Sequence, residues 1–489
     1  IKRNSAKEDL KIIQLFDAIA ALPDYDERIL LKKLTSIEKP QLANLKTHLY
    51  KQLLASLRLL KSNDSVDLQL HEQLDHARIL YGKGLYYQSL KILDKAKLLA
   101  HQYHQDSFLI QIISLEKKIE TLHITRSMTD RAGQLTLEAN QVNEKRKIIT
   151  QLSNLALQLY SWFVQNGHAR NEADEIGIKT FFKEALPASA AKLTGFYERL
   201  YLYQSYCWYA FIRQDFIMYY KYAQRWFDLF ETNKEMVEIE TGHYIKSMHI
   251  LLNAHFDLRN FGKFDKVLAH FEKFALSELP NKHDIFRVNS FVYINSAKLN
   301  KHLMQGTFKE GLQHVPALVK ELKALEIYLD QHRILVFNYK IATLYFGAGD
   351  YATSIDYLRR IINDHIDLRS DLQCYARLLH MMAHYELGNI ELIESSLIKS
   401  VYRFMAKMEN LTVIEEEMFT FLRGSFKDPS RKVTQALQEF LAKVKKYEKS
   451  RFETRAFAYL DVISWLESKV ENKTMSEIIY SKYLKSPHR

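Results

Sequence analysis

The chain has 489 residues, of which 47% are hydrophobic and 12% aromatic, and its formal net charge is +11. Only 14 residues are glycine and 7 are proline, whereas a sheet protein places these residues in turns roughly every 8 to 12 residues. The composition therefore excludes a turn-rich sheet protein and predicts an all-helical fold.

The sequence shows no sign of a membrane span or of a disulfide framework. No apolar run approaches the ~18 residues expected of a membrane helix. The two cysteines, Cys207 and Cys374, are too few for a framework and lack the C-x-x-C spacing. We therefore expect a cytoplasmic protein without membrane insertion.

The N-terminal segment predicts two helices joined by a short turn. Asp24 is a candidate N-cap because Glu27 follows three residues later, as in a capping box. A second helix would follow a turn at Glu38–Gln41 and would present Lys46 and Lys51. Because basic helices attract nucleic acid, a nucleic-acid-linked regulator is one alternative for the function.

A corner motif recurs along the chain. The stretches around Gly84 and Gly349 both carry alanine seven residues before the glycine, an aromatic residue two after it and serine five after it. Similar corners are expected at Gln214, Gly262, Gly306 and Gly388. The residue two past each corner is Tyr86, Phe216, Phe264, Phe308, Tyr351 or Ile390, so that five of the six are aromatic.

The spacing of these corners fits pairs of helices. From residue 214 onward the corners lie at 214, 262, 306, 349 and 388, and two helices with short connections occupy roughly 34 to 47 residues. Glycine accepts the left-handed conformation that ends a helix. The aromatic residue is expected to fill the wedge where the next helix turns back.

These features resemble the tetratricopeptide repeat over residues 201–400, with an isolated copy at 71–100. Ala342 and Tyr345 precede Gly349 where that family has a small residue and a tyrosine. Gln214 departs from the family at the corner, and Val267 and Ile393 replace its small residue, so the repeats are degenerate. The resemblance implies a right-handed α-solenoid of antiparallel helix pairs with helical caps. The whole chain also resembles a group of bacterial proteins in which a helical N-terminal segment leads into such repeats.

We expect four segments along the chain. They are a helical N-terminal segment at 1–68, a first pair with long helices at 69–185, the degenerate array at 186–425 and a basic helical cap at 426–489. In the last segment Asp428 is a candidate N-cap before Pro429, and Thr474 with Glu477 forms a candidate capping box. The segment from residue 427 onward holds 14 basic and 8 acidic residues.

Gly347–Ala352 also fits the glycine pattern of a dinucleotide-binding loop, G-x-G-x-x-A. Asp367 lies 20 residues past Gly347, where that fold places an acid for the ribose. The loop must follow a strand, however, and the corner recurs elsewhere without the second spaced glycine. The corner interpretation is favoured, and no cofactor is expected.

No catalytic or metal-binding motif emerges. His380 and His384 share a helix face, with Glu386 as the one candidate third ligand, and packed or surface histidines are the favoured interpretation. Phosphate-loop, nucleophile-elbow and thiol-nucleophile patterns are absent from the sequence. The chain is therefore expected not to be an enzyme, although a scattered site on helices stays open.

The expected function is a noncatalytic scaffold that binds a peptide or helix of another protein. In tetratricopeptide arrays, positions three, six, ten and thirteen residues before the corner line a concave groove, and the same positions are transferred to this chain. The candidate groove residues are Tyr201, Trp208, Phe211, Phe256, Arg259, Tyr293, Asn300, Tyr339, Phe346, Tyr375, Met382 and Tyr385. The alternative is that these aromatic side chains are buried as core.

Overall fold

The computed structural model of the chain is built from helices, and it has no strand in the residues that it describes. Those residues are 10–23, 25–34, 37–61, 65–123, 130–364, 369–408, 411–427, 433–448, 450, 452 and 460–487. The chain divides into two compact units, 1–146 and 147–489, and the boundary falls inside a long helix. The predicted all-helical fold is confirmed, whereas the division into four segments stays a prediction.

The first unit holds two groups of helices, each with its own core. Its elements are α1 (Leu10–Ala20), α2 (Glu27–Lys33), α3 (Lys39–Lys61), α4 (Val66–Gly82), α5 (Tyr86–Gln102), α6 (Asp106–Leu122) and the first part of α7 (Arg131–Asn166). Leu15 and Leu42 are buried in the core of α1 to α3. Leu90 and Ile112 are buried in the core of α4 to α7.

The start of α2 and the turn before α3 differ from the sequence prediction. The carboxylate of Asp26 caps α2 by accepting hydrogen bonds from the backbone N–H groups of Arg28 and Ile29, the second and third residues of the helix. Asp24, the predicted cap, lies outside the described residues. Helix α3 already begins at Lys39, so most of the predicted turn at Glu38–Gln41 is helical. Pro40 fits there because the first turn of a helix needs no N–H group from it.

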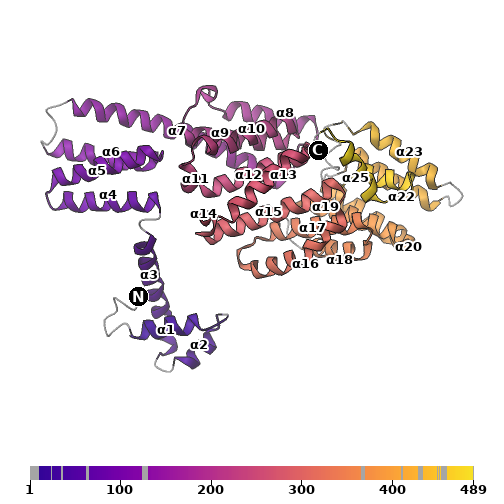
Figure 1. Cartoon of the computed structure of the whole chain (residues 1–489), viewed down its shortest axis with the longest axis horizontal. Coiled ribbons are helices and arrows are strands. Elements are labelled where there is room, and N and C mark those ends of the chain that lie inside the picture. Colours follow the sequence, from indigo (N-terminus) through magenta and orange to yellow (C-terminus); the bar gives the residue numbers. More distant parts are fainter. Residues whose placement is uncertain are drawn as a thin grey trace. The chain divides into compact units, whose positions relative to one another are not determined.

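The second unit is a succession of helices that pack on their neighbours in chain order (Figure 1). Its elements after α7 are α8 (Glu172–Ala185), α9 (Phe196–Ile212), α10 (Phe216–Thr232), α11 (Met236–Ile239), α12 (Thr241–Asp257), α13 (Phe261–Ala275), α14 (Glu278–Asn281), α15 (Asp284–Gln305), α16 (Phe308–Ala324), α17 (Gln331–Ala348), α18 (Tyr351–Ile362), α19 (Ser370–Glu386), α20 (Ile390–Leu392), α21 (Ile398–Lys407), α22 (Val413–Lys427), α23 (Val433–Lys446), α24 (Val462–Val470) and α25 (Met475–Lys485). Helices that end at successive corners also contact one another: α12 packs on α15, and α15 on α17.

One backbone geometry ends a helix at eight corners. Each has a residue of positive φ, and the next N–H group donates to the carbonyl five residues back, as Asp350 N does to Tyr345 O at 2.9 Å. This bond is the mark of the Schellman motif, which satisfies carbonyls that the helix end leaves free. The eight corner residues are Gly84, His104, Gln214, Arg259, Gly306, Gly349, Gly388 and Asn472.

Five of the six predicted corners are confirmed, and the one at Gly262 is wrong. The left-handed residue there is Arg259, with φ of 52°, and Gly262 lies inside α13. Phe261 is the aromatic residue two past the true corner and is buried. A non-glycine residue in this conformation costs roughly 1 kcal/mol or more, so corners are usually sought at glycines. Such a search does not find Arg259.

At each of two corners, an equivalent hydrogen bond joins the helix before the corner to the helix after it. The hydroxyl of Ser354 donates to the carbonyl of Ala342 at 2.8 Å, and Ser89 donates to Ala77 over the same distance. All four residues are fully buried. The sequence has a serine five residues after the corner and an alanine seven residues before it at both Gly84 and Gly349. In both places these two residues form the same hydrogen bond.

The dinucleotide-loop alternative, which the sequence analysis disfavoured, does not fit the structure of Gly347–Gly349. Gly347 lies inside α17, and a Cβ atom there would lie 2.5 Å from the Phe308 ring, which is the aromatic residue two past the preceding corner. Gly349 has a φ of 87° and ends the helix. Both glycines thus have packing or backbone roles. Asp367, the candidate ribose ligand, lies outside the described residues.

The C-terminal helices return to earlier corners. Ser476 of α25 donates to the carbonyl of Gly306 at 2.5 Å, and the Tyr483 ring lies 4.7 Å from that of Phe261. In α24, the Trp465 indole donates to Glu386 at 2.6 Å. The capping box of Thr474 and Glu477 is confirmed, and the candidate cap at Asp428 and Pro429 lies outside the described residues.

The corner geometry can be tested at Gly349, with Gly177 of α8 as a matched control. A Cβ atom meets open space at both positions, and only Gly349 has a positive φ. Gly349→Ala is expected to lower the free energy of unfolding by about 1–2 kcal/mol, whereas Gly177→Ala raises it by about 0.5–1 kcal/mol because alanine is the better helix former. All four tryptophans lie in the second unit, so tryptophan fluorescence during urea unfolding reports on it. Equal effects of the two changes would contradict the assignment.

The packing of Phe308 on Gly347 can be tested by a double-mutant cycle. Gly347→Ala is expected to lower the free energy of unfolding by about 1–3 kcal/mol because the added methyl group overlaps the ring. Combined with Phe308→Leu, which vacates part of that space, the loss should be at least about 0.5 kcal/mol smaller than the sum of the single losses. Strict additivity in urea unfolding would show that the ring does not constrain residue 347.

Candidate functional site

The correction at Arg259 changes which residues of α12 are candidates. Counting three, six, ten and thirteen residues back from Arg259 gives Phe256, Asn253, His249 and Lys246. Arg259 is thus the corner residue itself and not a position on the helix face. Sequence reasoning named neither His249, which also lies thirteen residues before Gly262, nor Lys246, which only the corner at Arg259 gives.

The twelve predicted groove residues fall into three classes of exposure. Arg259 is exposed. Half-buried are Tyr201, Trp208, Phe211, Phe256, Tyr293 and Tyr385. Buried are Asn300, Tyr339, Phe346, Tyr375 and Met382. The five buried side chains are core and cannot contact a partner in this structure, so the groove prediction is wrong for them.

The buried candidates contact elements that the local pattern did not include. The Tyr375 hydroxyl donates to Glu415 of α22 at 3.1 Å. Tyr385, which is half-buried, has its ring 6.1 Å from the Trp465 ring of α24. Because α22 and α24 cover the C-terminal corners, the side chains beneath them are removed from the surface.

The half-buried candidates on α9, α12 and α15 are linked by ring contacts. The Tyr201 ring lies 6.1 Å from His243, whose Nδ1 is 3.0 Å from the amide nitrogen of Gln204. Further along α12, His249 stacks on Tyr293 of α15 at 3.9 Å with planes 12° apart. Ring contacts thus join α12 to α9 at His243 and to α15 at His249.

Two arginines lie against further rings of α15 and α7. Arg333 of α17 lies 5.9 Å from the centre of the Tyr293 ring. Arg369, just before α19, lies 5.8 Å from the Phe163 ring of α7, and Phe163 is 5.5 Å from Trp208 of α9. We call this set the belt: Phe163, Tyr201, Trp208, Phe211, His243, Lys246, His249, Tyr293, Arg333 and Arg369.

The belt is strongly desolvated, although most of its side chains keep part of their surface in contact with solvent. Burial lowers the pKa of His243 to about 4. Burial, and then the charges of Lys246, Lys340 and Arg333, hold the pKa of His249 well below its usual value. The side chains of both histidines are nevertheless only half-buried. Both histidines therefore still expose part of their surface to solvent.

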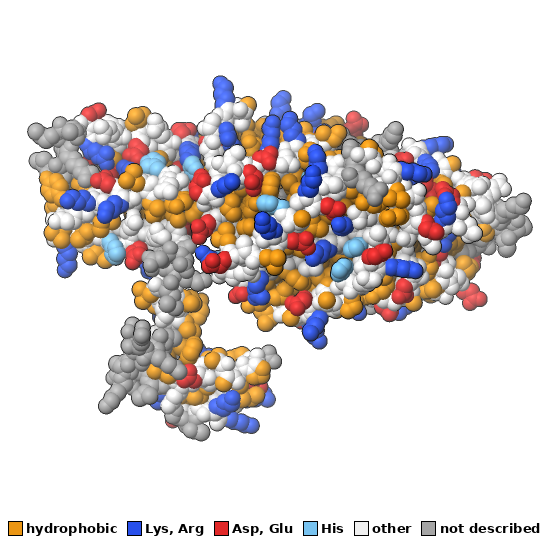
Figure 2. Space-filling model, viewed as in Figure 1, with side chains coloured by type: hydrophobic (Ala, Val, Ile, Leu, Met, Phe, Trp, Pro, Cys, Tyr) orange, Lys and Arg blue, Asp and Glu red, His pale blue; other side chains and the backbone are white. Residues whose placement is uncertain are grey.

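The charged groups near His249 are mostly basic. Lys246 has no ion-pair partner within the described ranges, and its ammonium lies 5.1 Å from the Tyr293 ring. Burial lowers the pKa of Lys340 and raises that of Asp257. The Asp257 Oδ2 atom is buried and accepts no hydrogen bond from the residues that the structure describes. Hydrophobic side chains are visible between charged ones across the second unit (Figure 2).

Lys340 and Ser296 form a polar pair at the middle of α15. Lys340 donates to the Ser296 hydroxyl at 2.5 Å, a pairing of residue types that can form a nucleophile and its base. Ser296, however, lies in the middle of α15, where helical hydrogen bonds occupy the backbone N–H groups. No pair of backbone donors is therefore free beside the hydroxyl to stabilise an oxyanion.

The histidine pair at 380 and 384 does not form a metal site with Glu386. The two rings lie 4.6 Å apart, but the Glu386 carboxylate accepts hydrogen bonds from Trp465 and from Lys469. In the described part of the chain no three His, Cys, Asp or Glu side chains are grouped so that they could hold a metal ion. Burial lowers the pKa of His380 to about 4, as expected for a packed neutral histidine.

Comparison with family models, with curated proteins and with solved structures finds no match for this chain. Among the residues that the structure describes, no helix combines the length and the apolar character needed to cross a membrane. Lys46, a candidate of the nucleic-acid alternative, forms an ion pair with Glu27 at 2.9 Å. Lys51 is exposed.

Histidines recur at three corners and were missed by the sequence analysis. His255, His302 and His384 each lie four residues before a left-handed residue and accept the corner hydrogen bond through the backbone carbonyl. The Nδ1 atom of each also faces the side chain of the residue after the corner, at 3.5 Å for Asn260, 2.8 Å for Thr307 and 2.9 Å for Asn389. Facing an asparagine NH2 group, a neutral Nδ1 can accept.

The corner histidines predict a loss of stability in acid. Burial lowers the pKa of His255 from 6.5 to about 4, so unfolding takes up a proton between these values and the free energy of unfolding falls as pH drops from 6.5 toward 4. Each such proton contributes a slope of about 1.4 kcal/mol per pH unit. His255→Gln should flatten the curve measured by urea unfolding, whereas His76→Gln, on the surface of α4, should leave it unchanged. Parallel curves for wild type and His255→Gln would contradict the prediction.

Proposed function

We propose that this chain is a noncatalytic, α-solenoid interaction scaffold similar to tetratricopeptide arrays, and that it binds a peptide or helix of another protein along the belt. The recurring corners support the solenoid, because each ends one helix at an equivalent point and lets helices such as α12, α15 and α17 pack side by side. Stacked helix pairs create extended surfaces that take linear segments. A cytoplasmic location belongs to this proposal, and the two buried cysteines, Cys207 and Cys374, which form no disulfide, are consistent with it.

The observation that carries the proposal is the half-buried stack of His249 on Tyr293, flanked by Lys246 and Arg333. Core rings lose almost all exposed area, and rings on an open surface stay well hydrated. The rings of His249 and Tyr293 lie between these two cases. A partner that covered them would bury their remaining exposed surface, and this would stabilise the complex because the stack already holds the rings in place. Interfaces concentrate their binding energy in such preorganised aromatic and arginine side chains.

The segment that binds is expected to carry at least one acidic residue. Lys246 lacks an ion-pair partner within the described ranges, whereas Arg333 already lies 3.2 Å from Asp330. A carboxylate of the partner beside Lys246 would form a partly desolvated ion pair, which contributes more than one on an open surface. Apolar side chains of the partner would pack on Trp208 and Tyr293.

Tyr293→Ala tests the proposal, and Tyr222→Ala of α10 is a matched control. Tyr222 is also half-buried and stacks on Tyr206 at 3.9 Å, but it lies outside the belt. Each change removes one stacked ring and should cost a similar, modest free energy of unfolding, on the order of 1–3 kcal/mol. In affinity capture from cell extract followed by mass spectrometry, Tyr293→Ala should lose a protein that wild type and Tyr222→Ala retain. Identical captures for all three chains would contradict binding along the belt.

A further inference from the structure

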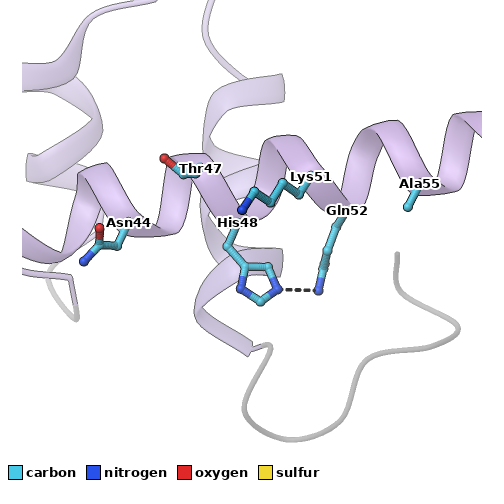
Figure 3. A pocket seen from close by; sticks show the side chains of 6 residues that line it. All are labelled: Asn44, Thr47, His48, Lys51, Gln52 and Ala55. Carbon is cyan, nitrogen blue, oxygen red and sulfur yellow. Dashed lines mark hydrogen bonds between the residues drawn. The ribbon is translucent and has the colours of Figure 1, made fainter.

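A second surface, on α3 of the first unit, has a different chemistry. Its side chains are spaced three, four, seven, eight and eleven residues from the first, which places them on one face of the helix. They line a shallow depression of about 390 Å³, and all of them belong to α3 (Figure 3). The six residues, called here the α3 face, are Asn44, Thr47, His48, Lys51, Gln52 and Ala55.

The α3 face consists of small or polar side chains. It offers two amides, a hydroxyl, an imidazole and an ammonium group, and its only apolar member is Ala55. Gln52 and His48 lie 2.9 Å apart through their side-chain nitrogens, which orients both on the same side of the helix. Amides bind adenine edges, lysine binds guanine edges or phosphate, and a small methyl group fits beside thymine.

The charge of α3 is entirely basic. The helix sequence contains five Lys or Arg residues and no Asp or Glu. Two of the basic side chains outside the α3 face form ion pairs: Lys46 with Glu27 at 2.9 Å and Arg58 with Asp75 at 3.0 Å. Lys51 lies on the α3 face itself and forms no ion pair with any residue that the structure describes.

We propose that the α3 face binds the major groove of double-stranded DNA. From Asn44 to Ala55 the face extends ~16 Å along the helix axis, and a helix fits in the ~12 Å wide major groove of B-form DNA. The basic character of α3 complements the phosphates on both sides of the groove. The deep, narrow major groove of an RNA duplex would not admit the helix. This surface is independent of the belt, because it lies in the other unit.

An exposed apolar strip beside the α3 face has to be separated from it in any test. Tyr50, Leu54 and Leu57 are 63%, 48% and 48% exposed, and they lie on the next side of α3. A strip of this kind next to basic residues also fits an anionic membrane surface or another protein. Double-stranded DNA is favoured for the α3 face because none of its six side chains is large and apolar.

The test measures fluorescence anisotropy of a labelled duplex of about 20 base pairs titrated with the full chain at ~50 to ~200 mM potassium chloride. Wild type is expected to bind at micromolar concentration, with an affinity that falls steeply as salt rises. Lys51→Gln should weaken binding several-fold and reduce the slope of log affinity against log salt by about 1. Lys91→Gln, an exposed lysine on α5 of the same unit, removes the same charge and should change neither.

Four outcomes would overturn the proposal. One is no binding to the duplex at ~50 mM salt, and another is an equal loss for Lys51→Gln and Lys91→Gln. A single strand of the same length bound as tightly as the duplex would exclude recognition of the groove. Binding to vesicles with a quarter phosphatidylserine but not to the duplex would assign α3 to a membrane surface instead. Far-UV circular dichroism confirms that each variant keeps its helices, so a loss of binding cannot be a loss of fold.

Discussion

The structure depends on one backbone hydrogen bond, in which the N–H group after a left-handed residue donates to the carbonyl five residues back. It ends a helix at a defined residue and reverses the chain, and it recurs at eight corners. Because the candidate surface positions are counted back from the residue that ends a helix, an error of three residues at one corner shifts that set of positions. Moving the corner of α12 from Gly262 to Arg259 keeps Phe256 and His249 and adds Asn253 and Lys246.

The corners also determine how neighbouring helices fit together. Phe308 follows one corner, and its ring occupies the space that a side chain at Gly347 would need, so two successive corners are matched in shape. Where the corner residue is Gln214 or Arg259, the fold accepts the strain of a left-handed side chain. Four of the eight corners lack glycine, which is consistent with a chain that has only 14 glycines in 489 residues.

Local sequence sufficed for the helical class and for five of the six predicted corners, because each depends on residues close together in the chain. It failed where the deciding contact joins distant residues. The approach of Arg369 to Phe163 and the cover of Tyr375 by α22 left no periodic signal near either partner. Four of the ten belt residues, Tyr201, Trp208, Phe211 and Tyr293, were found by position, whereas Lys246 required the correct corner.

The contact of α25 with Gly306 has a consequence for how the chain folds while it is being synthesised. A Cβ atom at Gly306 would lie 2.9 Å from the backbone of Ser476 and of Tyr480, so nothing else fills that place. The bond between Ser476 and Gly306 spans 170 residues. A ribosome adding 5–20 residues each second needs about 10–30 s to travel that far. Throughout this interval the Gly306 corner of a nascent chain would lack the cover of α25.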